Sequence, residues 1–375
     1  MVNFKSFRIS QKPVALERLD LKGKNVLVRV DFNCPVNKRG KVTNNYRVKE
    51  TLPTLRLLKQ KGAKKITLVT HFGRPPACRT GRDGKYKKEW SVKPVQKELE
   101  KLWKTKVYCP PYQNNFNKYA DTLLKFQVPS SKFQVCMWEN IRFWPEEEKN
   151  VAKFAKVLAK DQDIFINEAF SASHRAHASI TGTAKLLPAY AGLRLCEETR
   201  EIFQLMTKKI SPSVAIVGGA KIETKLPVLR TLAKYYDQII LGGKVAIEYN
   251  AMKNGRDNWK KKIVLPENFL GKDKFDIDEK SAREFAKIIQ RAKKILWNGP
   301  MGKFEYKKYR KGSVIIARAV CANKKALRLS GGGDTVELLE ELHLQNKAGF
   351  VSTGGGAMLD YIAYGTLPGI KILNY

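Results

Sequence analysis

Short runs of apolar, often β-branched residues recur along the whole chain, and most are followed by a polar or glycine-rich turn. Such runs predict buried β-strands. In the first half of the chain the predicted strands are residues 25–32, 65–71, 134–138 and 163–167. In the second half they are residues 213–217, 238–241, 262–265, 294–297, 326–329 and 349–352.

Between these strands, apolar residues recur at intervals of three and four, which is the spacing of an amphipathic helix. The clearest examples are residues 48–62, 151–161, 226–237, 282–294 and 335–344. Strands that alternate with helices predict parallel sheets covered on both faces, with right-handed crossovers. We therefore expect an α/β protein.

The alternation is interrupted near residues 187–200, where the proline- and glycine-containing segment LLPAYAGL precedes a helical pattern. At about 150 residues per domain, a chain of 375 residues is expected to form two domains. We place an N-terminal domain at residues 1–188 and a C-terminal domain at residues 189–375, joined by a helical connector.

The composition narrows the functional classes. Hydrophobic residues make up 43% of the chain and charged residues 28%, which argues against long disorder. No apolar run reaches the length of about 18 residues expected of a membrane span. The six cysteines lie far apart, without a zinc-binding or dense disulfide pattern, and this favours a reduced, cytoplasmic protein.

The net charge is large. Lysine and arginine number 71 against 35 aspartates and glutamates, a formal net charge of +36. Such a charge predicts affinity for anions, whether small phosphates, nucleic acid or acidic surfaces. It would also produce salt-sensitive, nonspecific binding of polyanions.

Polar, mostly basic side chains follow the predicted strands of the first half. Since ligands of open α/β sheets collect beyond the carboxyl ends of the strands, these side chains are expected to meet at one edge. Their mutual repulsion favours a small, multiply anionic ligand that neutralises them. The residues concerned are Asp31, Asn33, Arg47, His71, Arg74, Arg142 and Arg175.

Glycine-rich turns follow the strands of the second half, and several lead directly into a helix. Glycine lets the backbone approach a phosphate closely, and the helix start offers free N–H groups. Together they predict a nucleotide site without a Walker A or GxGxxG pattern. Asp334, at a helix start beside such a turn, is a candidate Mg²⁺ ligand as well as a candidate N-cap.

Lys221 and Lys225 are four residues apart, so they share one helix face and can reach along a polyphosphate.

Segments along nearly the whole chain, about residues 21–368, resemble the signature segments of the phosphoglycerate kinase family in the same order. They are VRVDFNCPV, THFGRP, ENIRF, NEAF, HRAHAS, VGGAKIETK, ILWNGPMGKFE, SGGGDT and STGGGAM. The resemblance implies two Rossmann-like domains around a central cleft, with the last residues packing back on the N-terminal domain. It also implies reversible transfer of the acyl phosphate of 1,3-bisphosphoglycerate to Mg-ADP by a monomer.

By position, the resemblance implies a 3-phosphoglycerate site in the N-terminal domain. Asp31 and Asn33 would hold the hydroxyl and carboxylate end of the glycerate. Arg47 would face the transferring phosphoryl group. The distal phosphate would be clamped by His71, Arg74, Arg142 and Arg175.

The resemblance also implies a nucleotide site in the C-terminal domain. Lys221 would meet the transferring phosphoryl group, as a catalytic residue alongside Arg47. Asp334 would bind Mg²⁺ and Glu305 the ribose. The other nucleotide-binding positions would be Gly219, Ala220, Lys225, Gly243, Asn298, Gly333, Thr335, Gly354 and Gly355.

The chain departs from the family pattern near the predicted base. Lys244 follows Gly242-Gly243 where the family has a third glycine, and residues 244–297 form a shorter segment than usual. These departures predict altered recognition of the base with the catalytic residues intact.

Two further function classes remain at the level of the sequence. A basic nucleic-acid-binding protein on a kinase-derived scaffold would explain the charge, although no RRM, KH, zinc-finger or helix-turn-helix pattern supports it. An NAD-dependent dehydrogenase would share the fold, but fold alone does not determine function.

Overall fold

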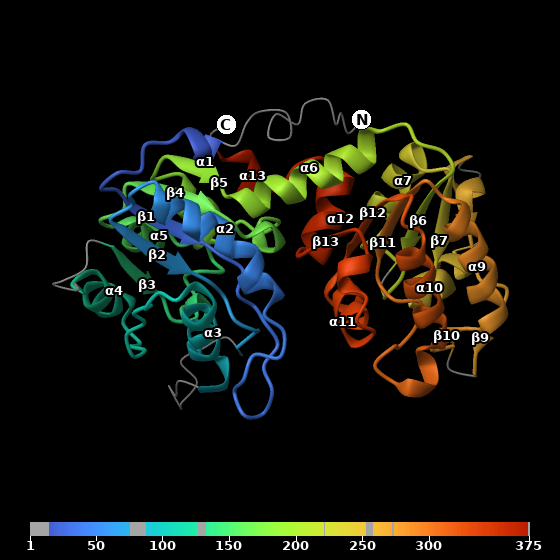
Figure 1. The fold of residues 1–375 in the computed structure, drawn as a ribbon, viewed down its shortest axis with the longest axis horizontal. Helices are drawn as coiled ribbons and strands as arrows, with labels where there is room; N and C mark the ends of the chain where they lie inside the picture. Colours follow the sequence, from blue (N-terminus) through green and yellow to red (C-terminus); the bar gives the residue numbers. More distant parts are fainter. Residues whose placement is uncertain are drawn as a thin grey trace. The chain divides into compact units, whose positions relative to one another are not determined.

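A computed structural model describes residues 15–75, 88–126, 133–220, 222–252, 258–271 and 274–373 (Figure 1). They form two compact units. The first comprises the described residues up to Glu198 together with those from Leu367, and the second comprises Thr199–Thr366. The expected α/β fold is confirmed, because each unit contains one parallel sheet with helices around it.

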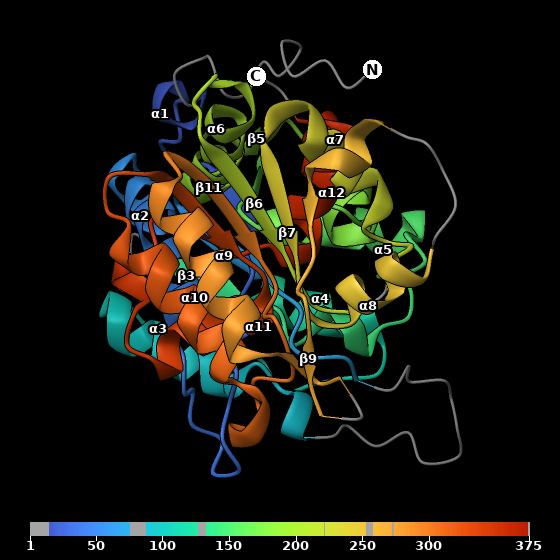
Figure 2. The same cartoon turned by 90° about the vertical axis from the view of Figure 1, so that its right-hand side faces the viewer.

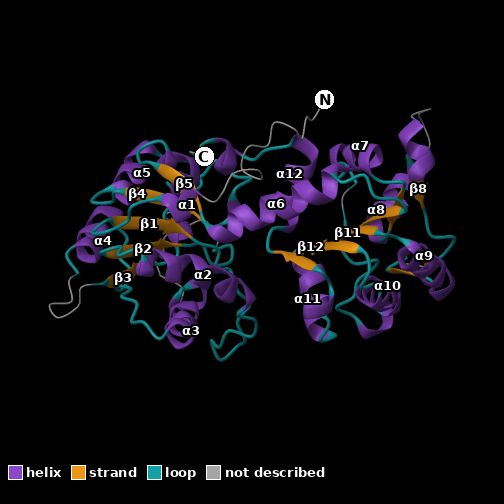
Figure 3. Ribbon diagram, turned by 45° about the horizontal axis from the view of Figure 1, so that its top comes forward, coloured by secondary structure: helices purple, strands orange, loops and turns teal. Residues whose placement is uncertain are grey.

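The sheet of the first unit has the strand order β3-β2-β1-β4-β5, with every neighbouring pair parallel. Its strands are β1 (Asn25–Arg29), β2 (Lys65–Val69), β3 (Gln134–Met137), β4 (Ile164–Asn167) and β5 (Ala189–Ala191). Its helices are α1 (Ala15–Arg18), α2 (Tyr46–Gln60), α3 (Lys93–Trp103), α4 (Phe116–Leu124), α5 (Ala152–Ala159) and α13 (Pro368–Lys371). Figure 3 shows α2 and α3 on one face of this sheet, with α4 and α5 on the other.

The sheet of the second unit has the order β13-β12-β11-β6-β7-β8 and is also parallel. Its strands are β6 (Ser213–Val217), β7 (Gln238–Leu241), β8 (Ile263–Val264), β11 (Lys294–Asn298), β12 (Leu327–Gly331) and β13 (Phe350–Ser352). A separate antiparallel pair is formed by β9 (Phe269–Leu270) and β10 (Asp276–Ile277).

Helices cover both faces of the second sheet (Figure 2). Helix α7 (Leu226–Tyr235) packs on α12 (Gly355–Tyr364), and α9 (Glu279–Arg291) packs on α10 (Lys311–Ala322). Helices α8 (Gly243–Ala251) and α11 (Gly333–Glu341) start directly after β7 and β12. Each sequence-predicted strand is present, and most of the strands are buried on both faces as a parallel sheet requires, whereas the edge strand β8 is only partly buried.

The boundary between the units differs from the predicted one at 188/189. It falls between Glu198 and Thr199, inside helix α6 (Leu193–Thr207). The reason is that the segment interpreted as a break contains β5, which pairs with β4 and completes the first sheet. The C-terminal segment belongs to the first unit, where the Asn167 side chain donates to the Gly369 carbonyl over 2.9 Å.

Helix α6 begins against a buried carboxylate at the end of β4. Glu168 Oε1 accepts hydrogen bonds from the Arg194 N–H over 3.1 Å and from the Thr54 hydroxyl over 2.5 Å. The same hydroxyl accepts the Leu193 N–H over 3.0 Å. Burial raises the pKa of Glu168 to about 8. Since Thr54 belongs to α2, these bonds connect α2 to the first turn of α6.

Some of the positive charge has a structural use. The Lys294 ammonium is buried and donates to the carbonyls of Lys208 and Tyr235, and Lys262 donates to those of Ala233 and Tyr236. Both lysines thereby satisfy carbonyls at the C-terminus of α7, where cations are favoured. Among the helices in the described ranges, none is long and apolar enough to cross a membrane.

Candidate active site

Each of the two sheets has its own point at which the strand order reverses, and predicted site residues lie on the loops at these points. In the first sheet the change falls between β1 and β4, and in the second between β6 and β11. The crevice outside such a switch point is the usual ligand site of an open α/β sheet. The loop after β1 carries Asp31, and the loop after β6 carries Gly219.

In the first unit, Asp31 is the meeting point of three segments. Its carboxylate forms an ion pair with Arg47, in the first turn of α2, and accepts a hydrogen bond from the Ser171 hydroxyl. It also accepts the Asn33 N–H over 3.1 Å. Ser171 was missed at the sequence level, because a serine in a loop after β4 is an ordinary turn residue.

The loop after β2 packs against the loop after β1. The Asn33 side chain accepts the Gly73 N–H over 2.7 Å, and the Gly73 carbonyl accepts a hydrogen bond from Arg142 over 2.6 Å. Arg142 comes from the short helix Ile141–Phe143 and is also paired with Glu148 over 3.2 Å. Arg74, in contrast, is exposed and is not buried with Asn33, Gly73 and Arg142.

His71 is surrounded by positive charge. Burial lowers its pKa well below the usual value, and Arg29, Arg142, Arg47 and Arg175 lower it further. Burial, followed by Arg175, also lowers the pKa of Arg142 to about 10. The structure therefore brings together three predicted arginines and one that was not predicted. We call Arg29, Arg47, His71, Arg142 and Arg175 the basic cluster.

Arg29 lies inside β1, and it orients His71. Its Nη2 is 3.1 Å from His71 Nδ1, and its Nε donates to the Ser179 hydroxyl over 2.8 Å. A guanidinium group has only donors, so His71 Nδ1 must accept and the proton of the neutral ring sits on Nε2. The available signal was an arginine inside an apolar strand, in VRVDF, but periodicity alone treats that position as core.

The positive charge of Arg29 is partly balanced by Glu147, which is connected to it through the Ser179 hydroxyl. Burial lowers the pKa of Arg29 to about 10, while Glu147 counteracts this effect. Glu147 is itself buried and accepts both the N–H and the hydroxyl of Ser179, over 2.9 and 2.6 Å. Arg175 donates to His174 over 3.1 Å. Asp31, Glu147 and Glu148 together offset three of the four arginines, so the basic cluster keeps an excess of positive charge, which suits an anionic ligand.

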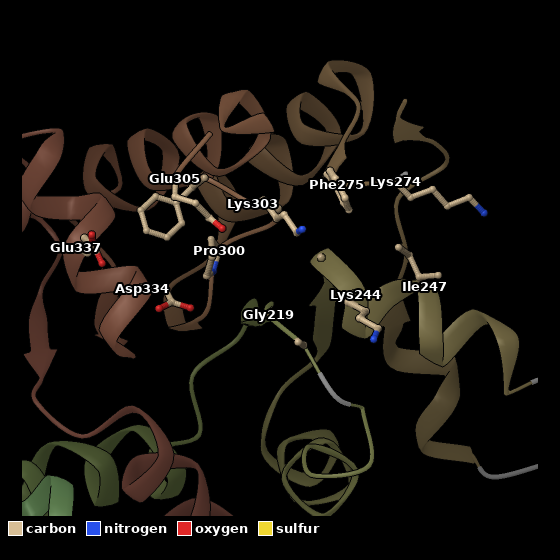
Figure 4. Close-up of a pocket in the computed structure, with 14 residues that line it drawn as sticks. Gly219, Lys244, Ile247, Lys274, Phe275, Pro300, Lys303, Glu305, Asp334 and Glu337 are labelled. Carbon is tan, nitrogen blue, oxygen red and sulfur yellow. The ribbon is translucent and has the colours of Figure 1, made fainter. Parts of the chain in front are cut away.

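In the second unit, a cavity of about 770 Å³ opens at the switch point (Figure 4). A volume of this size is typical of a cofactor or nucleotide site. Five of the predicted nucleotide-binding residues belong to its wall, namely Gly219, Ala220, Gly243, Glu305 and Asp334.

Glycine is required where the strand ends approach each other. A Cβ on Gly218 would lie 2.0 Å from the Pro300 carbonyl oxygen, and Gly219 has a φ of +92°. The Gly219 N–H donates to Pro300 over 3.2 Å, and the Gly243 N–H donates to Met301 over 2.8 Å. The floor of the cavity is therefore closely packed backbone, which a phosphate can approach.

Behind this floor, polar side chains connect the start of α7 and the start of α11 to the end of β11. Lys225 donates to the Asn298 side chain over 3.3 Å, and Thr335 accepts the Gly299 N–H over 2.8 Å. Burial lowers the pKa of Lys225 to about 8, although Asp334 partly offsets this. Lys225 is thus a poorly solvated cation next to the cavity, and a phosphate would stabilise its charge.

Two helix N-termini lie together beside the cavity. Helix α11 starts at Gly333 and α12 at Gly355, with Gly354 before it. A Cβ on Gly355 would lie 2.6 Å from the Gly332 Cα, so the two turns are in contact. Of this group only Asp334 belongs to the cavity wall, and Gly333, Gly354 and Gly355 lie outside it.

Lys221, the predicted catalytic lysine, lies outside the described residues. The next residue is held in place, because the Ile222 N–H donates to Glu248 over 2.7 Å. Lys244 lines the cavity, as expected, but its side chain is 66% exposed and its ammonium is 3.3 Å from Glu248. It therefore lies at the edge of the cavity and leaves the volume open.

The described residues contain no group of three or more histidine, cysteine, aspartate or glutamate side chains that could enclose a metal. Asp334 nevertheless fits Mg²⁺, which usually takes one or two carboxylates together with phosphate oxygens and water. Burial raises the pKa of Glu337, and the nearby carboxylates of Asp334, Glu341 and Glu305 raise it further.

Comparison with known proteins identifies the family. The phosphoglycerate kinase sequence profile matches residues 16–262 and 256–364. A phosphoglycerate kinase of Leptospira biflexa is 38% identical over 404 aligned residues, covering 96% of this chain and 97% of the relative. One of Moorella thermoacetica is 35% identical over 404 residues, covering 96% of this chain and 99% of the relative.

Solved structures of phosphoglycerate kinases also resemble this chain. The phosphoglycerate kinase of Coxiella burnetii superimposes with a TM-score of 0.73 at 31% identity, covering 94% of this chain and 97% of that one. The enzyme of Pyrococcus horikoshii gives 0.77 at 26% identity, covering 96% and 98%. These matches favour the kinase over the nucleic-acid-binding and dehydrogenase alternatives. The chain belongs to the phosphoglycerate kinase family.

Proposed function

We propose that this chain catalyses reversible transfer of the acyl phosphate of 1,3-bisphosphoglycerate to Mg-ADP, with the basic cluster as the glycerate site and the cavity as the nucleotide site. A terminal oxygen of the ADP β-phosphate attacks the acyl phosphate. The bond between phosphorus and the acyl oxygen breaks, and 3-phosphoglycerate leaves as a carboxylate. The observation that carries the proposal is the convergence of Arg29, Arg47, Arg142 and Arg175 on His71 at the carboxyl end of the first sheet.

The first unit binds the glycerate mainly through charged side chains. Arg142, Arg175 and the neutral His71 clamp the distal phosphate, Asp31 and Asn33 orient the glycerate, and Arg74 approaches from the surface. Arg47 leaves Asp31 to stabilise the charge on the transferring phosphoryl group. Phosphoryl transfer depends on such positioning and neutralisation more than on a covalent nucleophile.

The second unit holds the nucleotide. Gly219, Ala220, Gly243 and the helix starts at Gly333, Gly354 and Gly355 offer backbone to the phosphates. Lys225, Asn298 and Thr335 lie at the phosphates, Glu305 accepts from the ribose, and Lys221 meets the transferring group. Asp334 would hold Mg²⁺, which supplies charge neutralisation at the phosphate oxygens when bound.

The test is a spectrophotometric assay of the purified chain with 3-phosphoglycerate and Mg-ATP at low salt. Turnover that is lost in Arg47→Ala, with the fold retained by circular dichroism, is the expected result. A folded sample without turnover would refute the proposal.

We also propose that the enzyme is a cytoplasmic monomer, as the family resemblance implies. Cys109, Cys136 and Cys321 are free thiols, which fits a reducing compartment. Light scattering at assay concentrations measures the oligomeric state, and a stable dimer would contradict this part of the proposal.

A further inference from the structure

The cavity of the second unit carries opposite charges at its two ends. Asp334 and Glu337, both on α11, lie at one end together with Glu305, as Figure 4 shows. Lys244 on α8 and Lys274 lie at the other end, and Lys303 and Phe275 lie between the two groups. Charge alone would draw the phosphates to the lysines, so the orientation of a nucleotide depends instead on the Gly219 backbone and on Mg²⁺ at Asp334, as in the proposed function.

If the proposed function holds, the phosphates occupy the end with Gly219 and Asp334, and the ribose lies near Glu305. The base then reaches the opposite end, between the start of α8 and the segment that contains Lys303. This orientation places two ammonium groups, and no carboxylate of the cavity wall, beside the base.

Lys303 is held in a defined position. Its N–H donates to the Phe275 carbonyl over 2.8 Å, and its ammonium lies over the Phe275 ring, 3.7 Å from the ring centroid. Two attachments to the same residue restrict a side chain that would otherwise sample many rotamers. In Figure 4 the Lys303 ammonium points to the middle of the cavity, whereas Lys274 extends away from it.

The same end is poor in hydrogen-bond acceptors. The Phe275 carbonyl already accepts the N–H of Lys303. Among the described residues that line the cavity there is no asparagine or glutamine. Those side chains are the ones that pair with the donor and acceptor edge of adenine.

We propose that this cavity prefers a 6-oxopurine nucleotide, with guanine or hypoxanthine as the base, over an adenine nucleotide, and that Lys303 determines the preference. The O6 and N7 atoms of a 6-oxopurine are adjacent acceptors, and a lysine is a common partner for them. Adenine instead presents its N6 amino group, a donor that would face an ammonium donor. Lys244 adds a second positive charge at the edge.

The test compares kcat/KM for Mg-ITP, Mg-GTP and Mg-ATP with 3-phosphoglycerate as the acceptor. Hypoxanthine differs from adenine at the 6-position, with the accompanying proton at N1, so the ratio of ITP to ATP isolates this feature. We expect ITP and GTP to exceed ATP by about tenfold. Lys303→Met should bring the ratio close to one, and Lys303→Arg should retain most of it.

Lys287→Met is the matched control, because it removes the same charge from α9, where Lys287 is paired with Glu284 over 2.7 Å. The ratio should not change in this variant. ATP that is used as well as ITP by the wild type would overturn the inference, and so would a ratio that Lys303→Met leaves unchanged.

Calorimetric titration with IDP and ADP, without glycerate, separates this inference from the proposed function. Tighter binding of IDP in a protein without turnover would refute only the proposed function. Turnover with a preference for ATP would refute only the base preference.

Discussion

The basic cluster and the cavity both lie at the switch point of a parallel sheet, but they present different chemistry to a phosphate. The first unit uses side-chain charge: Arg29 and Arg142 are so poorly solvated that burial lowers the pKa of each to about 10. The second unit uses backbone: Gly218, after β6, allows Gly299 and Pro300, after β11, to approach within the space of a missing Cβ.

The difference indicates which substitutions each site tolerates. Ligand binding at the basic cluster should weaken when one charge is removed but should change little with a small change of side-chain volume. Ligand binding at the cavity should weaken when one methyl group is added to its glycine backbone but should change little when a charge at its edge is removed.

Arg47→Ala should have the largest effect. Its guanidinium is proposed to stabilise the transferring phosphoryl group, so kcat should fall by about 10²–10³-fold. Arg47→Lys should retain only part of the wild-type kcat, because an ammonium cannot reproduce two parallel hydrogen bonds. Arg56→Ala, an exposed position on the same helix, is the control. An unchanged kcat in Arg47→Ala would exclude a catalytic role.

Gly218→Ala should damage the second site alone. The new methyl group would lie 2.0 Å from the Pro300 oxygen, so the backbone must shift. We expect a loss of about 1–3 kcal/mol in the free energy of unfolding of the second unit and weaker nucleotide binding. Urea denaturation and calorimetry measure these quantities.

Gly356→Ala is its control, since a Cβ at that position meets nothing within 4 Å. Equal effects of the two substitutions would show that the floor is less closely packed than described.

The two sites should also differ in their response to alkaline pH. Burial lowers the pKa of Lys225 to about 8, so this lysine loses its charge as the pH rises above 8 in the free enzyme. We expect kcat/KM for the nucleotide to fall by up to about tenfold per pH unit there. Because the pKa of Arg142 is about 10, kcat/KM for the glycerate should stay constant up to about pH 9.

Lys225→Met should remove the fall in kcat/KM for the nucleotide. Parallel pH profiles for the two substrates would contradict the assignment of Lys225 to the nucleotide alone.

Lys244→Ala should have the smallest effect on stability. Its side chain is 66% exposed and its ammonium pairs with Glu248, one turn along α8. Exposed ion pairs of this kind contribute about 0.2–1 kcal/mol, so thermal unfolding should shift only slightly. A large shift would mean that Lys244 helps to build the cavity.

The strands and the convergence of charges could be predicted from the sequence, because buried parallel strands leave continuous apolar runs and their carboxyl ends share one edge. Arg29 could not, since its role depends on burial beside His71 and on Glu147, which is distant in sequence. Strand β5 and the boundary within α6 were missed because Ala189–Ala191 is short and lies beside proline and glycine. Strands β9 and β10 have two residues each and carry no periodicity.

The most direct test of the account is a pair of calorimetric titrations on two variants, each with 3-phosphoglycerate and with Mg-ADP. Arg175→Ala should weaken binding of 3-phosphoglycerate by about tenfold or more and leave the Kd of Mg-ADP unchanged. Gly218→Ala should do the reverse. A variant that weakens both ligands equally would contradict the division of the reaction between two independent sites.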